Sequence, residues 1–129
     1  MPKIVFAEDN GQVRSMLVKT VIGLASGMET TEAQNGDEAL AIIHDRKPDL
    51  LVTDINMGSR AMDGLTLIET LQRKELLTFP VIIFATPVDE QMDKVMEMMM
   101  EHEGLIFFVM KGGMDRLKAK IREVLHLAD

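Results

Sequence analysis

Short runs of apolar residues alternate along this chain with longer segments in which apolar residues recur every three to four positions. A short apolar run that stops at polar residues is typical of a buried strand, and a period of three to four is typical of a helix with one buried face. The pattern predicts strands at residues 3–7, 28–33, 50–53, 81–85 and 106–110. It predicts helices over 13–24, from Asp37 to just before Pro48, over 65–76, over 89–102, and over a last segment whose apolar face runs from Leu117 to Ala128.

This strand-then-helix alternation predicts the class of fold. Strands of continuous apolar residues are buried on both faces, and their alternation with helices places them parallel in a sheet between two helical layers. Right-handed crossovers leave few topologies, of which the doubly wound one is favoured. No repeat, low-complexity linker or change in composition divides the chain. We therefore expect an α/β fold with a doubly wound, five-stranded parallel sheet, in a single domain spanning residues 1–129.

Charged or hydroxyl-bearing residues follow four of these predicted strands. The first strand is followed by Glu8 and Asp9, the third by Asp54 and the last by Lys111. Thr86 follows the fourth strand. Open α/β sheets bind ligands at the carboxyl ends of their strands. We therefore expect three carboxylates, a hydroxyl and an ammonium group to lie together in one shallow site.

The chemistry of such a site favours a divalent cation and a phosphoryl group. Neighbouring carboxylates repel one another, and a hard cation removes that cost. Mg²⁺ suits the site because it binds one or two carboxylates and keeps water positions for a phosphate ligand. A lysine pairs with phosphate oxygens as a point charge. An aspartate can attack phosphorus and form an aspartyl phosphate, in which case catalysis is mostly positioning and charge neutralisation.

The composition narrows the class of protein further. The 129 residues include 21 acids and 14 bases, a net charge of -7, which repels the phosphate backbone of nucleic acids. The chain has no cysteine, which fits a reducing compartment. It has no apolar run as long as a membrane span and no apolar leader of the length a signal peptide needs. We therefore expect a soluble, cytoplasmic domain that binds neither nucleic acid nor membrane.

An ordered set of motifs resembles the receiver domain of two-component response regulators, which has a flavodoxin-like fold. The resemblance covers the whole chain in order, and each motif alone is weak. The motifs are Glu8-Asp9, the segment KPDLLVTDINM at residues 47–57, Met62-Asp63-Gly64-Leu65, Pro80-Val81-Ile82-Ile83, and Lys111. The resemblance implies a signalling domain rather than an enzyme, phosphorylated by a phosphohistidine on a histidine kinase or a phosphotransfer protein.

The resemblance also implies roles for individual residues. Asp54 matches the phosphoacceptor, and Lys111 matches the lysine that contacts the phosphoryl group. Three residues match the Mg²⁺ site: Asp9 as the principal ligand, Glu8 as its acidic neighbour, and Asn56 through its backbone carbonyl. A further match, Phe108, is the aromatic residue that swings inward when domains of this family activate.

The sequence departs from the family's pattern in the loop after the phosphoacceptor and at the end of the fourth strand. Residues 58–61 make the loop two residues longer, and Arg60 in it is either solvated or approaches the phosphate or a partner. The family has Ser or Thr at the end of the fourth strand. Counted from Pro80, this position falls on Ala85; counted from Asp54, it falls on Thr86. We favour Thr86 as the switch hydroxyl, and Ala85 would remove that hydroxyl.

A third departure follows Lys111, where the family usually has a proline in a cis bond. Gly112 takes its place, and a cis bond before any other residue costs about 3 kcal/mol. We therefore expect a trans Lys111–Gly112 bond, with glycine bending the loop.

The last two helices are expected to form the output surface, because the resemblance implies it. Residues 89–103 are mostly acidic and residues 116–122 mostly basic, a distribution that suits either a partner of complementary charge or plain solvation. Methionines are frequent in the helix over 89–102. Its period predicts a buried stripe at Met92, Val95, Met96 and Met99, with Met98 and Met100 off it.

The resulting hypothesis is a response regulator receiver that accepts a phosphoryl group on Asp54 with Mg²⁺. No effector domain follows Asp129, so output is expected through protein contact or relay to a second histidine, unless the chain is a fragment. A phosphorylation-independent docking module is the alternative, motivated by Ala85 and Gly112. A Mg²⁺-dependent phosphohydrolase is disfavoured, because no second acid lies two residues after Asp54 and no substrate cap is predicted.

Overall fold

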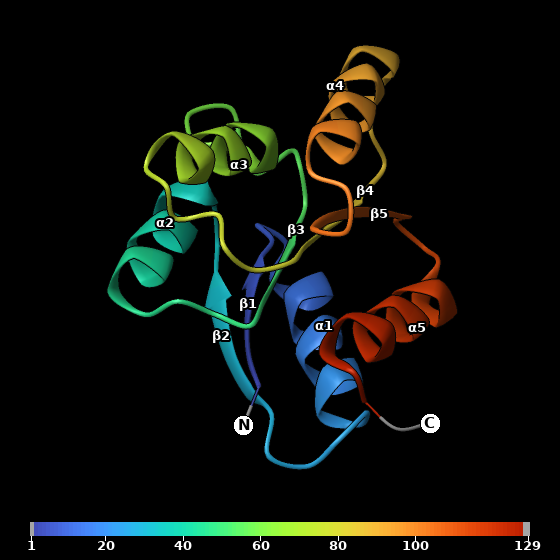
Figure 1. The fold of residues 1–129 in the computed structure, drawn as a ribbon. Helices are drawn as coiled ribbons and strands as arrows, with labels where there is room; N and C mark the ends of the chain where they lie inside the picture. The colour runs from blue at the N-terminus through green and yellow to red at the C-terminus, as the bar shows by residue number, and fades with distance from the viewer. Residues whose placement is uncertain (1, 128–129) are drawn as a thin grey trace.

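The apolar runs pair into one parallel sheet of five strands in a computed structural model that describes residues 2–127. The strand order is β2-β1-β3-β4-β5 (Figure 1). The chain therefore moves outward from β1 to β2, returns to β3 on the other side of β1, and continues to β5. This reversal confirms the predicted doubly wound topology. The strands are β1 Lys3–Ala7, β2 Glu29–Ala33, β3 Leu50–Thr53, β4 Val81–Ala85 and β5 Ile106–Met110.

Four helices connect the strands, a fifth follows β5, and together they cover both faces of the sheet (Figure 1). Buried side chains of α1 and α5 pack on one face, and those of α2, α3 and α4 pack on the other. The helices are α1 Gly11–Ile22, α2 Gly36–Asp45, α3 Gly64–Arg73, α4 Asp89–Glu101 and α5 Met114–Leu125. Ala128, which the pattern assigned to the last apolar face, lies outside the described residues.

Three of the helices, α1, α2 and α3, begin where polar side chains satisfy their first amide groups. The Asn10 side chain accepts hydrogen bonds from the amides of Gln12 and Val13, so α1 begins two residues before the predicted start. Asn35 and Asp63 accept in the same way at the starts of α2 and α3. Such caps stabilise a helix by about 1 kcal/mol each. These caps therefore fix where the three helices begin. Helices α1 and α2 begin shortly after β1 and β2, and α3 begins beside the site described below.

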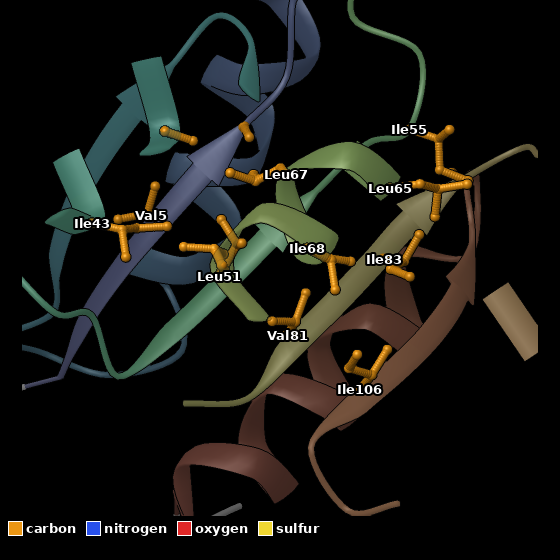
Figure 2. Close-up of a cluster of buried hydrophobic side chains, with 14 of the residues drawn as sticks. Val5, Ile43, Leu51, Ile55, Leu65, Leu67, Ile68, Val81, Ile83 and Ile106 are labelled. Carbon is orange, nitrogen blue, oxygen red and sulfur yellow. The ribbon is translucent and has the colours of Figure 1, made fainter. Parts of the chain in front are cut away.

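Strands β1, β3, β4 and β5 send alternate side chains into one of two apolar layers. Val5, Leu51, Val81, Ile83 and Ile106 pack with residues of α2 and α3 (Figure 2). Ile4, Phe6, Val52, Ile82 and Phe84 point to the opposite face and pack against α1 and α5. Burying one such side chain contributes about 1.5–3 kcal/mol. The two layers hold the strands in one register and so fix the positions of their carboxyl ends.

The packing of α4 corrects part of the predicted methionine stripe. Val95 and Met98 are buried, and Met92 and Met99 are partly buried against the same layer. Met96 is 53% exposed and Met100 is 76% exposed. The predictions were therefore wrong for Met96 and Met98 and right for Met100. The buried face follows positions 92, 95, 98 and 99, and Met96 is turned away from it.

Candidate functional site

Three of the predicted site residues lie at one edge of the sheet, each fixed by a backbone hydrogen bond to a neighbouring strand. The amide of Glu8 donates to the carbonyl of Ala33, and the amide of Asp54 donates to the carbonyl of Ala7. The amide of Lys111 donates to the carbonyl of Ala85. The parallel pairing therefore continues one residue beyond β1, β3 and β5, which places these three side chains together.

Lys111 joins the two acids that follow β1 and β3. Its ammonium nitrogen lies 2.6 Å from Oε1 of Glu8 and 2.7 Å from Oδ2 of Asp54. The side chain of Glu8 is only 2% exposed and that of Asp54 is 11% exposed. Water therefore screens this three-residue cluster little, and its ion pairs are stronger than surface pairs.

The other oxygen of each acid accepts a hydrogen bond from the backbone. The amide of Asn10 donates to Oε2 of Glu8 over 3.1 Å, and the amide of Ile55 donates to Oδ1 of Asp54 over 2.7 Å. Both carboxylates are therefore held in one orientation, between the lysine on one side and a loop amide on the other.

The burial of this cluster shifts the protonation of two of its members. Burial raises the pKa of Glu8, and the hydrogen bonds from Lys111 and from the amide of Asn10 offset this only in part. Burial alone would lower the pKa of Lys111. The hydrogen bonds to Asp54 and Glu8 outweigh that effect, and the pKa of Lys111 is raised. The lysine therefore stays charged at neutral pH.

Asp9 completes a set of carboxylates that fits a divalent cation. Asp9 is exposed, and one oxygen from each of Glu8, Asp9 and Asp54 lies within 4.8 Å of the others. Oxygen donors of this kind match the preference of Mg²⁺. Glu8 differs from the other two in its burial, because its side chain is only 2% exposed.

Asn56 lies in the loop after Asp54 with its backbone carbonyl available. Among residues 2–127, no hydrogen bond is made to this carbonyl. The side chain of Asn56 is held from α4, because Oδ1 accepts a hydrogen bond of 2.8 Å from Nε2 of Gln91. Sequence reasoning missed Gln91, since it lies 35 residues away in a helix with many other polar residues.

Gly64 supports Asp54 from the start of α3. Its amide donates to the carbonyl of Ile55 over 2.8 Å, and a Cβ atom at this position would overlap the carbonyl oxygen of Asp54. The same oxygen accepts a hydrogen bond from the buried hydroxyl of Thr53. The Met-Asp-Gly motif signalled a family resemblance but did not reveal this close contact, which only glycine permits.

Arg14 supports the other acidic segment from α1. Its guanidinium donates to the carbonyl of Glu8 over 2.8 Å and pairs with Glu32 over 2.9 Å. Arg14 therefore connects the turn that carries Glu8 and Asp9 to β2, the strand that contains Glu32. Sequence reasoning missed this residue too, because an arginine in the first turns of a helix usually faces solvent.

The end of β4 gives Ala85 and Thr86 different surroundings. Ala85 is the last strand residue, pairs with Met110 and is buried in the layer that contains α4. Thr86 lies beyond the strand, is exposed, and its hydroxyl makes no hydrogen bond within residues 2–127. Ala85 thus holds the last strand position, and Thr86 is the first residue beyond it. A switch role for Thr86 stays a prediction.

The remaining predicted residues surround the site at a distance from its charges. Phe108 is partly buried and packs against the layer beneath α4. Arg60 is exposed in the loop after Asp54 and forms no ion pair in the described part of the chain. No peptide bond in residues 2–127 is cis, so the trans Lys111–Gly112 bond is confirmed. Gly112 has φ +100°, a conformation that favours glycine.

Comparisons with known proteins agree with this geometry. The sequence profile of the response regulator receiver domain matches residues 4–122. The DNA-binding transcriptional regulator NtrC of Salmonella typhimurium is 33% identical over 64% of this chain and 16% of its own length. The alkaline phosphatase synthesis transcriptional regulatory protein PhoP of Bacillus subtilis is 31% identical over 73% of this chain and 37% of its own length. The chain thus spans well under half of either relative.

Solved structures of similar fold include three with 20–24% identity. A Francisella response regulator receiver domain has a TM-score of 0.79 and covers 98% of both chains. The Vibrio cholerae chemotaxis protein CheY4 has a TM-score of 0.76 and covers 96% of this chain and 98% of its own. The Thermotoga maritima response regulator TrrA, in complex with Mg²⁺ and BeF, has a TM-score of 0.75 with coverage of 96% and 99%. Within residues 2–127, no helix is long and apolar enough to cross a membrane.

Proposed function

Since this chain belongs to the response regulator receiver domains of two-component systems, we propose that it accepts a phosphoryl group on Asp54 and signals through the change in shape that follows. The observation that carries the proposal is the contact of Lys111 with both Asp54 and Glu8, at 2.7 and 2.6 Å. A positive charge held beside an oriented carboxylate at the sheet edge suits an incoming phosphoryl group.

The proposed transfer uses a phosphohistidine as donor, on a histidine kinase or a phosphotransfer protein. One oxygen of Asp54 forms a bond to phosphorus while the bond between phosphorus and the imidazole nitrogen breaks, and the nitrogen keeps the electron pair. The amide of Ile55 and the ammonium of Lys111 hold the carboxylate in place before attack. Lys111 then pairs with phosphoryl oxygens, since its charge is not consumed by the reaction.

The donor set described above fits Mg²⁺, and the ligands proposed for it are Asp9, Asp54 and the backbone carbonyl of Asn56, with Glu8 beside them. When bound, the ion neutralises negative charge on the phosphoryl oxygens. Because Glu8 is buried and already hydrogen-bonded, its proposed part is to keep Lys111 in the site and to add negative charge near the cation.

We further propose that output passes through the face formed by α4, β5 and α5. Three large apolar side chains of α4 and β5 are exposed: Met96, Met100 and Met110. Exposed methionines adapt to partner surfaces. Phe108 lies beneath this face and is the proposed aromatic switch. This role is signalling rather than turnover of a substrate, so the only chemistry expected is gain and loss of the phosphoryl group.

Intact-mass spectrometry after incubation with acetyl phosphate and Mg²⁺ tests the proposal. The expected result is the gain of one phosphoryl group by the wild-type chain and none by Asp54→Asn or in the presence of EDTA. Asp49→Asn is the matched control, because Asp49 lies at the opposite end of β3 and should leave the gain intact. No gain by the wild-type chain would overturn the proposal and favour the docking-module alternative.

A further inference from the structure

A single side chain, that of Gln91, connects the loop after Asp54 with the start of α4. Its Nε2 donates to Oδ1 of Asn56 over 2.8 Å, and its Oε1 accepts from the amide of Val88 over 3.1 Å. Both ends of the amide are therefore used. Gln91 is partly buried in the first turn of α4, and Asn56 is exposed two residues after Asp54.

Within residues 2–127, the one side-chain hydrogen bond to a backbone amide at the start of α4 is the bond that Gln91 accepts from Val88, because the residue before the helix has no polar side chain. Val88 precedes the first helical residue and cannot accept a hydrogen bond from the helix amides. Asn10, Asn35 and Asp63 supply such acceptors for α1, α2 and α3. Gln91 makes a different contact at α4: it accepts from the amide of Val88, the residue before the helix.

Few polar contacts tie α4 to the rest of the domain. Within residues 2–127, its side-chain hydrogen bonds and ion pairs to other elements are Gln91 with Asn56 and Lys94 with Glu69. The Lys94 pair is at 3.4 Å between side chains about half exposed, so it contributes little. The Gln91 contact is thus the specific polar link between α4 and the site.

Ala85, the last residue of β4, has no hydroxyl, and the hydroxyl of Thr86 makes no hydrogen bond within residues 2–127. Neither residue therefore provides a hydrogen-bonded link from the site to α4. Asn56 suits that role, since its backbone carbonyl faces no partner in the described chain while its side chain is already bound to α4.

We propose that Gln91 is a positioning residue that holds Asn56 and thereby couples the state of the acidic site to the order of the first turn of α4. This inference rests on the proposed function, because it takes Asn56 as part of the site that binds Mg²⁺ and the phosphoryl group. When Asn56 moves to engage the ligand, the amide of Gln91 moves with it or loses its partner. In either case the position or the order of Oε1 of Gln91, which accepts from the amide of Val88, changes.

Hydrogen exchange measured by NMR, with and without Mg²⁺ and beryllofluoride, tests this coupling. The expected result is an exchange change of about two- to tenfold at the first-turn amides of α4 in the wild-type chain, as for one hydrogen bond made or lost. Gln91→Glu keeps an acceptor for Val88 but has no amide to donate to Asn56, and Gln91→Met lacks both. Both variants are expected to lose the ligand-dependent change, and so is Asn56→Ala.

Lys94→Met is the matched control, because it breaks the other polar contact of α4 and is expected to keep the change. The amide of Ile55, which donates to Asp54, reports whether the site itself responds. Two results would overturn the coupling and leave the proposed function standing. In the first, exchange at the amide of Ile55 changes with the ligand but exchange at the first-turn amides of α4 does not. In the second, those amides of α4 change equally in the wild-type chain and in Gln91→Glu. No response at Ile55 would overturn both.

Discussion

The backbone of Gly64 lies against the carbonyl of Asp54 so closely that a Cβ atom would overlap its oxygen. The first turn of α3 therefore packs against the backbone of the proposed phosphoacceptor and holds it in place. We predict that Gly64→Ala destabilises the domain by about 1–3 kcal/mol, as overpacking in a well-packed core does. Urea unfolding measures this. Gly11→Ala is the control, because the nearest atom to a new Cβ there is 3.8 Å away and the free energy of unfolding should hardly change.

Gly64→Ala should also slow phosphorylation by acetyl phosphate while the domain remains folded, because relief of the overlap moves the backbone of Asp54. Mass spectrometry over time gives the rate. A variant that is as stable as the wild-type chain and is phosphorylated at the same rate would contradict the supporting role of Gly64.

Replacing Lys111 by methionine should leave two carboxylates close together without their shared cation. Because Glu8 is buried, we predict a loss of about 1–3 kcal/mol in the free energy of unfolding at neutral pH. The double variant Glu8→Gln with Lys111→Met should recover part of this loss, since it removes the buried charge that lost its partner. Denaturant titration of the three variants checks the prediction, and equal stability of the single and double variants would argue against a strong Glu8–Lys111 pair.

The raised pKa of Glu8 makes the stability of the metal-free domain depend on pH. The folded state binds the proton more tightly than the unfolded state, whose pKa is near the ordinary value of 4.5. The resulting stabilisation is fully present below that value and is lost as the pH rises through the higher folded-state pKa. As the pH rises, the free energy of unfolding of the wild-type chain should therefore fall relative to that of Glu8→Gln. Unfolding measured at a series of pH values in EDTA checks this, and a constant difference would refute it.

The hydroxyl of Thr86 should contribute to the response to a phosphoryl group. It is exposed and has no hydrogen-bond partner within residues 2–127, so it is free to donate to a phosphoryl oxygen. Thr86→Val keeps the shape of the side chain and removes this hydroxyl. We predict that the NMR response of Phe108 to Mg²⁺ and beryllofluoride is lost in Thr86→Val and retained in Thr86→Ser. An unchanged response in Thr86→Val would refute the switch role of Thr86.

The fold was largely predictable because burial on both faces leaves a strong signal in a sequence. All residues of β4 from Val81 to Ala85 are buried and apolar, so the run and its limits were clear. The edge strand β2 is mostly exposed and gave a weaker pattern. The face of α4 was partly mispredicted because most apolar positions in it are methionines, which fit two adjacent stripes equally well; the contact with the sheet selects one.

The site was predictable as far as its residues directly follow strands. Glu8, Asp54 and Lys111 meet because parallel strands end at one edge, a consequence of topology alone. The supporting residues depend on contacts between distant segments. Gln91 and Asn56 are separated by 35 positions, and no local pattern encodes their hydrogen bond.

The ion pair between Lys111 and Glu8 joins residues 103 positions apart. Lys111 comes from the last strand of the sheet, whereas Glu8 and Asp54 follow strands that are synthesised earlier. A nascent chain that has completed β1 and β3 therefore carries both acids without their lysine. If Asp54 is phosphorylated as proposed, assistance by Lys111 is thus confined to chains that have added β5 to the sheet.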